Sequence, residues 1–200
     1  MMTGVILAGG QNRRMGGKLK ALLPIEGEAL LLRQLKEMSP LCTQVLVVTN
    51  TPDVFSPLLA AVSSTMNVQC VPDRYVQKGP LSGLHAGCLD ATESLLWVVG
   101  CDMPFLSADA AKAMGKLCQD ENKDAVIPVI NGRIHPLHGV YAQSVGQRAE
   151  ALLAKEQYRL MGLLNHLEWV AVENDFFNKR QISTLFTTNI NSPEQYDSIR

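Results

Sequence analysis

The sequence predicts one α/β domain over residues 1–200, with three layers in which helices cover both faces of a doubly wound, mostly parallel, Rossmann-like sheet. Two observations lead to this fold class. Short, continuously apolar segments end abruptly at glycine, asparagine or aspartate, as buried parallel strands do where they enter loops. Segments with leucines at helical spacing alternate with these apolar segments at short intervals. The length is sufficient for one such domain with a hydrophobic core.

The first half alternates strands and helices. We expect strands at residues 3–8, 45–48, 67–71 and 95–99, and helices at 30–38, 54–62, 85–93 and from the N-cap Ser107 to about Cys118. This order is the pattern of parallel strands joined by helical crossovers.

The second half adds a small antiparallel element. A strand at 124–130 precedes Asn131-Gly132, which is a strong signal for a tight hairpin, and a partner strand at 134–141 that Pro136 limits to an edge or a bulge. We then expect a long helix at 147–167, a strand at 169–172, a loop at 174–181 and a last helix capped by Ser192.

Composition and charge describe an ordinary globular protein. The chain is 46% hydrophobic and 18% charged, and its net charge of −1 gives no sign of a general nucleic-acid or membrane-surface binder. Five scattered cysteines without a C-x-x-C pair argue against a disulfide framework or a zinc ribbon and fit a reducing cytosol. No segment has the length and pattern of a membrane span or a signal peptide, so we expect a cytoplasmic protein.

A glycine pair and a group of cations follow the first expected strand. The strand ends in Leu7-Ala8-Gly9-Gly10, and the cations behind it are Arg13, Arg14, Lys18 and Lys20. Glycines let backbone N–H groups approach a phosphate, arginine makes forked contacts to it, and lysine adds a point charge. The spacing matches neither the dinucleotide fingerprint nor the P-loop. Glycines alone would favour a plain turn, but with these cations a phosphate-binding loop is favoured.

Aspartates follow two of the expected strands. Asp73 follows the strand at 67–71 and Asp102 the strand at 95–99, so both belong at the carboxyl edge of the sheet, where open α/β folds bind ligands. Magnesium is held by one or two carboxylates together with substrate phosphates and water. Asp102 is placed to hold such an ion against a triphosphate. The alternative is that it only caps the turn before Pro104.

These motifs together resemble the molybdenum cofactor guanylyltransferase (MobA) family of the MobA-like nucleotidyltransferase superfamily. The resemblance rests on Leu-Ala-Gly-Gly at 7–10, Arg-Met-Gly at 14–16 with Lys20 and Leu22, Asp73 with Gly-Pro-Leu-x-Gly at 79–83, Cys-Asp-x-Pro at 101–104 and Asn-x-Asn at 189–191. These motifs occur in the family's order, and the resemblance runs from about residue 4 to residue 197.

The resemblance implies transfer of GMP from GTP to the terminal phosphate of molybdenum-bound molybdopterin, with Mg²⁺ as cofactor and pyrophosphate as product. The implied catalytic residues are Lys20, Arg14 and Asp102, with Asp102 as metal ligand; the nucleotide side adds Leu7, Ala8, Gly9, Gly10, Asn50, Asp73 and Gly79, and the acceptor side Asn189, Asn191 and His135. The nucleotide half would be about 1–105 and the acceptor half about 106–200. Leu19 stands where the family often has aspartate, so Lys18 is a rival to Lys20. Contacts with other proteins of molybdenum cofactor biosynthesis would be transient.

Two other functions stay open at this point. A cytidylyltransferase would use the same scaffold, although cytidylyl relatives usually have Leu-Ala-Ala-Gly where this chain has Leu-Ala-Gly-Gly. A non-catalytic nucleotide-binding protein would not need Lys20, Asp73 and Asp102 together. For the asparagines and His135, a purely structural role is the alternative.

Overall fold

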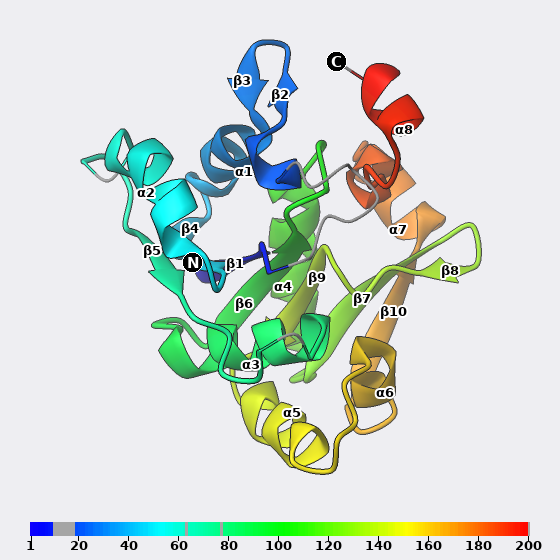
Figure 1. Ribbon diagram of the computed structural model, residues 1–200. Helices are drawn as coiled ribbons and strands as arrows, with labels where there is room; N and C mark the ends of the chain where they lie inside the picture. The colour runs from blue at the N-terminus through cyan, green and yellow to red at the C-terminus, as the bar shows by residue number, and fades with distance from the viewer. Residues whose placement is uncertain (10–18, 63, 77, 200) are drawn as a thin grey trace.

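The computed structural model describes residues 1–9, 19–62, 64–76 and 78–199. The phosphate-loop candidates Gly10, Arg14 and Lys18 therefore lie outside the described residues. Within the described parts, helices stand on both faces of a central sheet, so the expected three-layer α/β fold is confirmed (Figure 1).

The central sheet is mixed but mostly parallel. Its strands are β1 (Met2–Leu7), β4 (Cys42–Val48), β5 (Val68–Val71), β6 (Leu95–Gly100), β7 (Ala125–Ile130), β8 (Arg133–Ile134), β9 (Gly139–Ala142) and β10 (Trp169–Glu173). They lie in the order β10-β7-β9-β6-β1-β4-β5, and β8 pairs with β7. Strand β9 is antiparallel to β6 and β7, whereas β5, β4, β1 and β6 are parallel. The chain leaves β1 on one side through β4 and β5 and returns on the other through β6, so a topological switch point lies between β1 and β6.

Alternate side chains of the strands feed two apolar cores. In β1, Ile6 belongs to one core and Val5 to the other. The core of Ile6 includes α1 (Leu30–Met38), α2 (Pro52–Ala60), α4 (Ala108–Asp120) and α7 (Asn174–Asn178), and the core of Val5 includes α3 (Pro80–Asp90), α5 (Val145–Leu153) and α6 (Leu160–Leu164). Because helices bury both faces, the central strands are continuously apolar instead of alternating.

The strands and helices expected in the first half are present, some with shifted ends. Helix α1 has the expected bounds, whereas α3 begins at Pro80 and not at residue 85. Gly79 has φ +76°, a left-handed conformation that favours glycine, and Pro80 follows at the first helical position. A 3₁₀ turn, η2 (Lys20–Leu22), and a short hairpin of β2 (Pro24–Ile25) and β3 (Glu28–Ala29) were not anticipated.

The hairpin expected at Asn131-Gly132 is confirmed, but its partner strand is not continuous. Asn131 and Gly132 have φ +51° and +75°, and Ile130 pairs with Arg133 across the two-residue turn. The expected strand at 134–141 is wrong as a single element, because it divides into β8 and β9. Proline 136 lies in the gap, and His138 there has φ +64°.

A buried imidazole occupies this break. Nε2 of His138 accepts a 3.1 Å hydrogen bond from the backbone N–H of Ser107, the N-cap residue of α4, and the ring contacts Trp97 and Phe186. Burial lowers the pKa of His138 to about 3, so the ring is neutral at physiological pH. His138 thus joins the irregular segment to the start of α4.

Two further expectations for the second half are corrected. The long helix at 147–167 divides into α5 and α6, since Glu156 between them has φ +58°, outside the α-helical region. The loop expected at 174–181 contains α7. The last helix, α8 (Pro193–Asp197), starts as expected, with the Ser192 hydroxyl accepting a hydrogen bond from the backbone N–H of Gln195.

The described helices are short, and the five cysteines are buried or partly buried. No helix in these parts of the chain is both long and apolar enough to cross a bilayer. The five cysteines are free, and burial raises the pKa of the Cys42 and Cys88 thiols to about 12. These two thiols are therefore protonated, small core side chains at neutral pH.

Candidate active site at the carboxyl edge of the sheet

The register of the parallel strands brings distant polar residues to one edge. Leu7 pairs with both Val48 and Gly100, and Val48 pairs with Val71, so β1, β4, β5 and β6 end level with one another. The candidates that follow these strands at this edge are Ala8, Gly9, Asn50, Asp73 and Asp102. The sequence prediction that the two aspartates share one sheet edge is thus confirmed.

A partly buried ion pair lies at the switch point. Nζ of Lys20 is 3.2 Å from Oδ2 of Asp102, and the two side chains are only 14% and 21% exposed. Lys20 starts the η2 turn, which is anchored by the buried side chain of Ala21. Asp102 follows β6, and the backbone N–H of Cys101 donates to the carbonyl of Leu7 in β1. A cation and a carboxylate are therefore held together beside the ends of β1 and β6.

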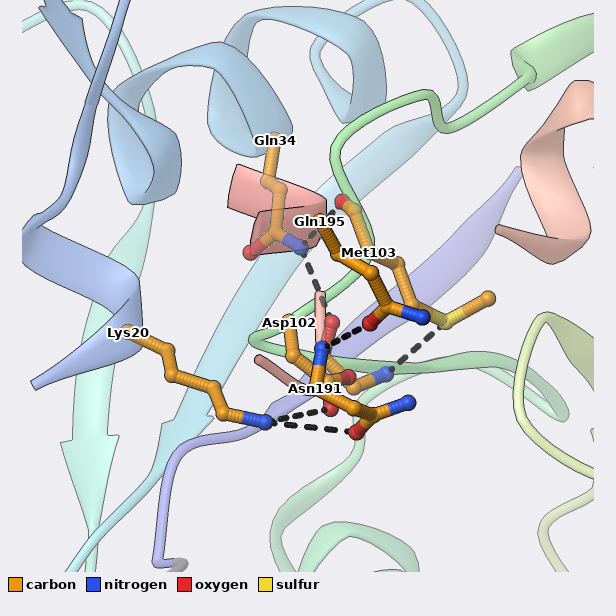
Figure 2. A network of polar contacts seen from close by, with 7 residues as sticks. Lys20, Gln34, Asp102, Met103, Asn191 and Gln195 are labelled. Atoms are coloured by element: carbon orange, nitrogen blue, oxygen red, sulfur yellow. Dashed lines mark hydrogen bonds and ion pairs between the residues drawn. The ribbon is translucent and has the colours of Figure 1, made fainter. Parts of the chain in front are cut away.

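The C-terminal segment completes this group. Lys20 also donates to Oδ1 of Asn191 at 3.4 Å (Figure 2). The backbone N–H of Ile190 donates to the backbone carbonyl of Asp102 at 2.8 Å. Residues 188–191 lie outside the helices and strands, and the two asparagines have different surroundings. Asn191 contacts Lys20, whereas the buried amide oxygen of Asn189 has no hydrogen-bond partner among the described residues.

Asp73 lies in a second polar group, at the end of β5. Its Oδ1 accepts hydrogen bonds from the Ser82 hydroxyl and from the backbone N–H of Tyr75. Its own backbone N–H donates to Oδ1 of Asn50 at 3.2 Å, which links the ends of β4 and β5. Only 9% of Asp73 is exposed. Asn50 and Asp73 are thus in contact, and α3 supplies the hydroxyl that orients the aspartate.

A pocket of about 510 Å³ lies beside Gly79. Its walls come from three segments: Lys78, Gly79 and Pro80; Pro136 and Leu137; and Tyr158, Arg159, Leu160 and Met161. A Cβ at Gly100 would lie 3.3 Å from the Leu137 side chain, so Leu137 contacts both this pocket and the turn that carries Asp102. Nζ of Lys78 lies 4.4 Å from the ring centroid of Tyr158.

His135 is half-buried one residue before this wall. Its backbone N–H donates to the carbonyl of Pro128, and desolvation, reinforced by Arg133, lowers the pKa of its imidazole. The lining residues nearest to it in sequence are Pro136 and Leu137. The structure thus brings the His135 segment next to the Gly79 loop.

The donor atoms of the site suit a magnesium ion shared with a substrate. Among the described residues, no group of three or more His, Cys, Asp or Glu side chains could hold a metal by itself. Asp102 supplies one hard carboxylate in a partly buried position, which matches the way Mg²⁺ is bound by one or two carboxylates plus phosphates and water. The residues fit Mg²⁺ that arrives with a triphosphate.

A thiol nucleophile is not available beside Asp102. Desolvation raises the pKa of the Cys101 thiol to about 12, and the charge of Asp102 acts in the same direction. The thiol is therefore protonated at neutral pH and is a poor nucleophile.

Sequence reasoning missed two groups of residues. Gln34, Ser82 and Ile190 contact the candidates or their backbone, and Leu137, Tyr158 and Arg159 line the pocket. Gln34 left one signal: it is the polar residue on the buried side of α1, among Leu31, Leu35 and Met38. The others act through backbone groups or long-range contacts, which no local pattern reveals.

Comparison with known proteins gives a consistent family. Residues 4–170 match the family model described as the MobA-like NTP transferase domain. A probable molybdenum cofactor guanylyltransferase of Pelotomaculum thermopropionicum is 32% identical over 174 residues, which cover 86% of this chain and 80% of that protein. A protein of the same description from Geobacillus sp. strain WCH70 is 28% identical over 199 residues, covering 99% of this chain and 97% of the relative.

Solved structures share the fold. The molybdopterin-guanine dinucleotide biosynthesis protein A from Archaeoglobus fulgidus superposes with a TM-score of 0.82 at 23% identity, covering 99% of this chain and 96% of that one. A 4-diphosphocytidyl-2C-methyl-D-erythritol synthase from Anaerococcus prevotii has a TM-score of 0.69 at 14% identity, with 98% and 95% covered. The same fold therefore occurs in structures whose names refer to guanine and to cytidine nucleotides.

Proposed function

The chain belongs to the MobA-like NTP transferase family, and we propose that it transfers GMP from GTP to the terminal phosphate of molybdenum-bound molybdopterin. The names of its relatives support guanylyl transfer. The observation that carries the proposal is the meeting of Lys20, Asp102 and Asn191 at the topological switch point. A cation, a carboxylate and an amide there can hold a triphosphate, its metal and a second substrate.

The reaction needs charge neutralisation and alignment more than proton transfer. An oxygen of the acceptor phosphate forms a new bond to the α-phosphorus of GTP, while the bond to the β-phosphate oxygen breaks and its electron pair leaves with pyrophosphate. The attacking phosphate is already anionic, so no general base is required. Lys20 would neutralise phosphate charge as it develops, and Asp102 would hold Mg²⁺, which screens the triphosphate when bound. We also assign Arg14 to the phosphates.

We assign the ends of β1, β4 and β5 to the nucleotide. The backbone from Leu7 to Gly10 would approach the phosphates, and the Asn50–Asp73 pair and Gly79 would contact the sugar and base. A Cβ at Gly9 would have no neighbour within 4 Å among the described residues, so none of these residues requires glycine there by packing. Open space beside a nucleotide is the reason we give for glycine at this position.

The acceptor would lie on the side of the C-terminal segment. We assign Asn189, Asn191 and His135 to the acceptor. We also assign to it the pocket beside Gly79, which Leu137 lines. The pocket has mostly apolar walls with the cationic residues Lys78 and Arg159, which suits a flat heterocycle that carries an anionic group. In this assignment the half at about 1–105 serves the nucleotide and the half at about 106–200 supplies most of the acceptor side, with Lys78 of the first half at the boundary between them. We place the enzyme in the cytoplasm, where its free cysteines stay reduced and other biosynthetic proteins of the cofactor would make transient contacts.

The deciding experiment measures pyrophosphate release from purified protein with molybdenum-bound molybdopterin, Mg²⁺ and each of GTP and CTP. We expect GTP-dependent release that is abolished without acceptor or metal. Pyrophosphate release with CTP but not with GTP would assign the chain to the cytidylyl class. Nucleotide binding without pyrophosphate release from GTP or CTP would support a non-catalytic binder.

A thermal-shift titration gives an independent measure of nucleotide choice. GTP with Mg²⁺ at about a hundred times its dissociation constant should stabilise the protein by about 2.7 kcal/mol, and CTP at the same concentration by much less. Equal stabilisation by the two nucleotides would contradict the guanine assignment.

A further inference from the structure

A single glutamine interrupts the apolar side of α1. Leu31, Leu35 and Met38 are buried on this helix, and Gln34 between them is only 1% exposed. A buried amide is costly unless it makes hydrogen bonds; Nε2 of Gln34 makes two, whereas its buried Oε1 has no partner among the described residues.

Both amide hydrogens of Gln34 are directed to the turn that carries Asp102. Nε2 lies 2.9 Å from the carbonyl oxygen of Gly100 and 2.9 Å from that of Met103 (Figure 2). The amide thereby connects the residues on either side of the Cys101–Asp102 pair. Rotating the amide by 180° would face its oxygen with two carbonyl oxygens, so the hydrogen-bond pattern selects this orientation.

The other side of the turn is held by the C-terminal segment. The carbonyl of Asp102 accepts from the backbone N–H of Ile190, and the N–H of Cys101 donates to Leu7. Together with Gln34, these contacts tie the backbone of 100–103 to β1, α1 and residue 190. Fixing this backbone sets the direction of the Cα–Cβ bond of Asp102, from which the carboxylate reaches Lys20.

We propose that Gln34 is a positioning residue that aims the Asp102 carboxylate at the metal–nucleotide complex by clamping the carbonyls on either side of it. The inference rests on the proposed function in one respect, namely that Asp102 binds the metal. Groups that orient a metal ligand typically change metal affinity by about tenfold to a hundredfold when removed. Gln34 contacts neither substrate nor metal in this role, and it acts through the backbone of Asp102.

Gln44 provides a matched control. It is a second buried glutamine, 4% exposed, but it lies in β4 and is bound to Thr3, Thr92 and Asp90 at the opposite end of the strands. Gln34→Met and Gln44→Met both remove a buried amide of the same size, so both should lower the melting temperature. Only the first releases the Asp102 turn.

The test is a Mg²⁺ titration of each folded variant at fixed GTP, read both as thermal stabilisation and as pyrophosphate release. We expect Gln34→Met to need about tenfold or more Mg²⁺ for half-maximal stabilisation, with Gln44→Met close to wild type. The shorter Gln34→Asn keeps an amide that reaches one carbonyl at most, so it should be intermediate, and it carries the test if Gln34→Met does not fold.

A double-variant comparison separates positioning from a general loss of structure. In an Asp102→Asn background, Gln34→Met should raise the Mg²⁺ requirement by less than twofold, because the carboxylate that it aims is gone. The same shift with and without Asp102, or equal Mg²⁺ curves for Gln34→Met and Gln44→Met, would overturn the inference. If the wild-type protein is stabilised by Mg²⁺ and GTP but releases no pyrophosphate, the proposed function is contradicted. The Mg²⁺ dependence of thermal stabilisation then still tests the positioning role of Gln34.

Discussion

The backbone N–H of Ile190 donates a 2.8 Å hydrogen bond to the backbone carbonyl of Asp102. These two residues are far apart in the sequence, and their contact makes the C-terminal segment part of the candidate active site. The side chain of Ile190 is fully buried in a small apolar cluster with Leu23, Ile25 and Leu30. The position of Asn191 beside Lys20 therefore depends on packing around Ile190.

Ile190→Ala should impair catalysis more than its effect on stability explains. Removing this buried side chain should cost about 2–5 kcal/mol of unfolding free energy and should loosen the contact of Asn191 with Lys20. Met114→Ala, in the remote core of α4, is the matched destabilised control. Equal turnover of the two variants, measured below their melting temperatures, would contradict a role of this segment in the site.

Lys20→Ala should lose turnover more heavily than Lys18→Ala. Lys20 is held against Asp102 and Asn191, and its loss leaves phosphate charge without this cation, so we expect a fall in kcat of about a hundredfold or more. Lys36→Ala removes another ion-paired lysine, one that is exposed, and should be near wild type. Steady-state kinetics with GTP as the varied substrate measure the effect. If Lys18→Ala is inactive while Lys20→Ala is active, Lys18 is the catalytic lysine.

Asp102→Asn should fold normally and lose activity. The amide keeps the shape and one carbonyl oxygen but removes the negative charge that attracts Mg²⁺, so turnover should fall by about a hundredfold or more, equivalent to a few kcal/mol. Excess Mg²⁺ should restore part of the loss. The measurement is pyrophosphate release across a magnesium titration with a melting curve as the folding control. Asp120→Asn, which changes an exposed aspartate of α4, is the matched variant. Near-normal turnover at low magnesium would refute the metal role.

Gly100→Ala should disturb Asp102 through direct contact. A Cβ at residue 100 would lie 2.7 Å from Oδ1 of Asp102 and 3.3 Å from the Leu137 side chain, so the carboxylate must move. We expect kcat to fall by about tenfold or more, in line with the sensitivity of metal sites to ligand orientation. Gly162→Ala, in α6 with no atom within 4 Å of its Cβ among the described residues, is the control and should be active and slightly more stable. Full activity of Gly100→Ala would show that the carboxylate tolerates displacement.

The sequence determined the parallel core of the fold and the type of residue at each strand end. Short continuous apolar segments are typical of strands buried on both faces, and the order of strands and helices then requires Asp73 and Asp102 to emerge at one edge. The tight turn at Asn131-Gly132 could also be predicted from the local sequence, because the residues that adopt positive φ are those of the turn itself.

Only the tertiary structure decided which candidates meet and what holds them. Segments that are remote in sequence meet at this site: Lys20 contacts Asp102 and Asn191, and Gln34 contacts the turn at 100–103. The hydrophobic periodicity of the sequence does not predict contacts between such segments. The strand break at His138 also depends on a positive φ at a residue whose ring is buried against Trp97 and Phe186. Local patterns specify elements, whereas side-chain contacts across elements specify the site.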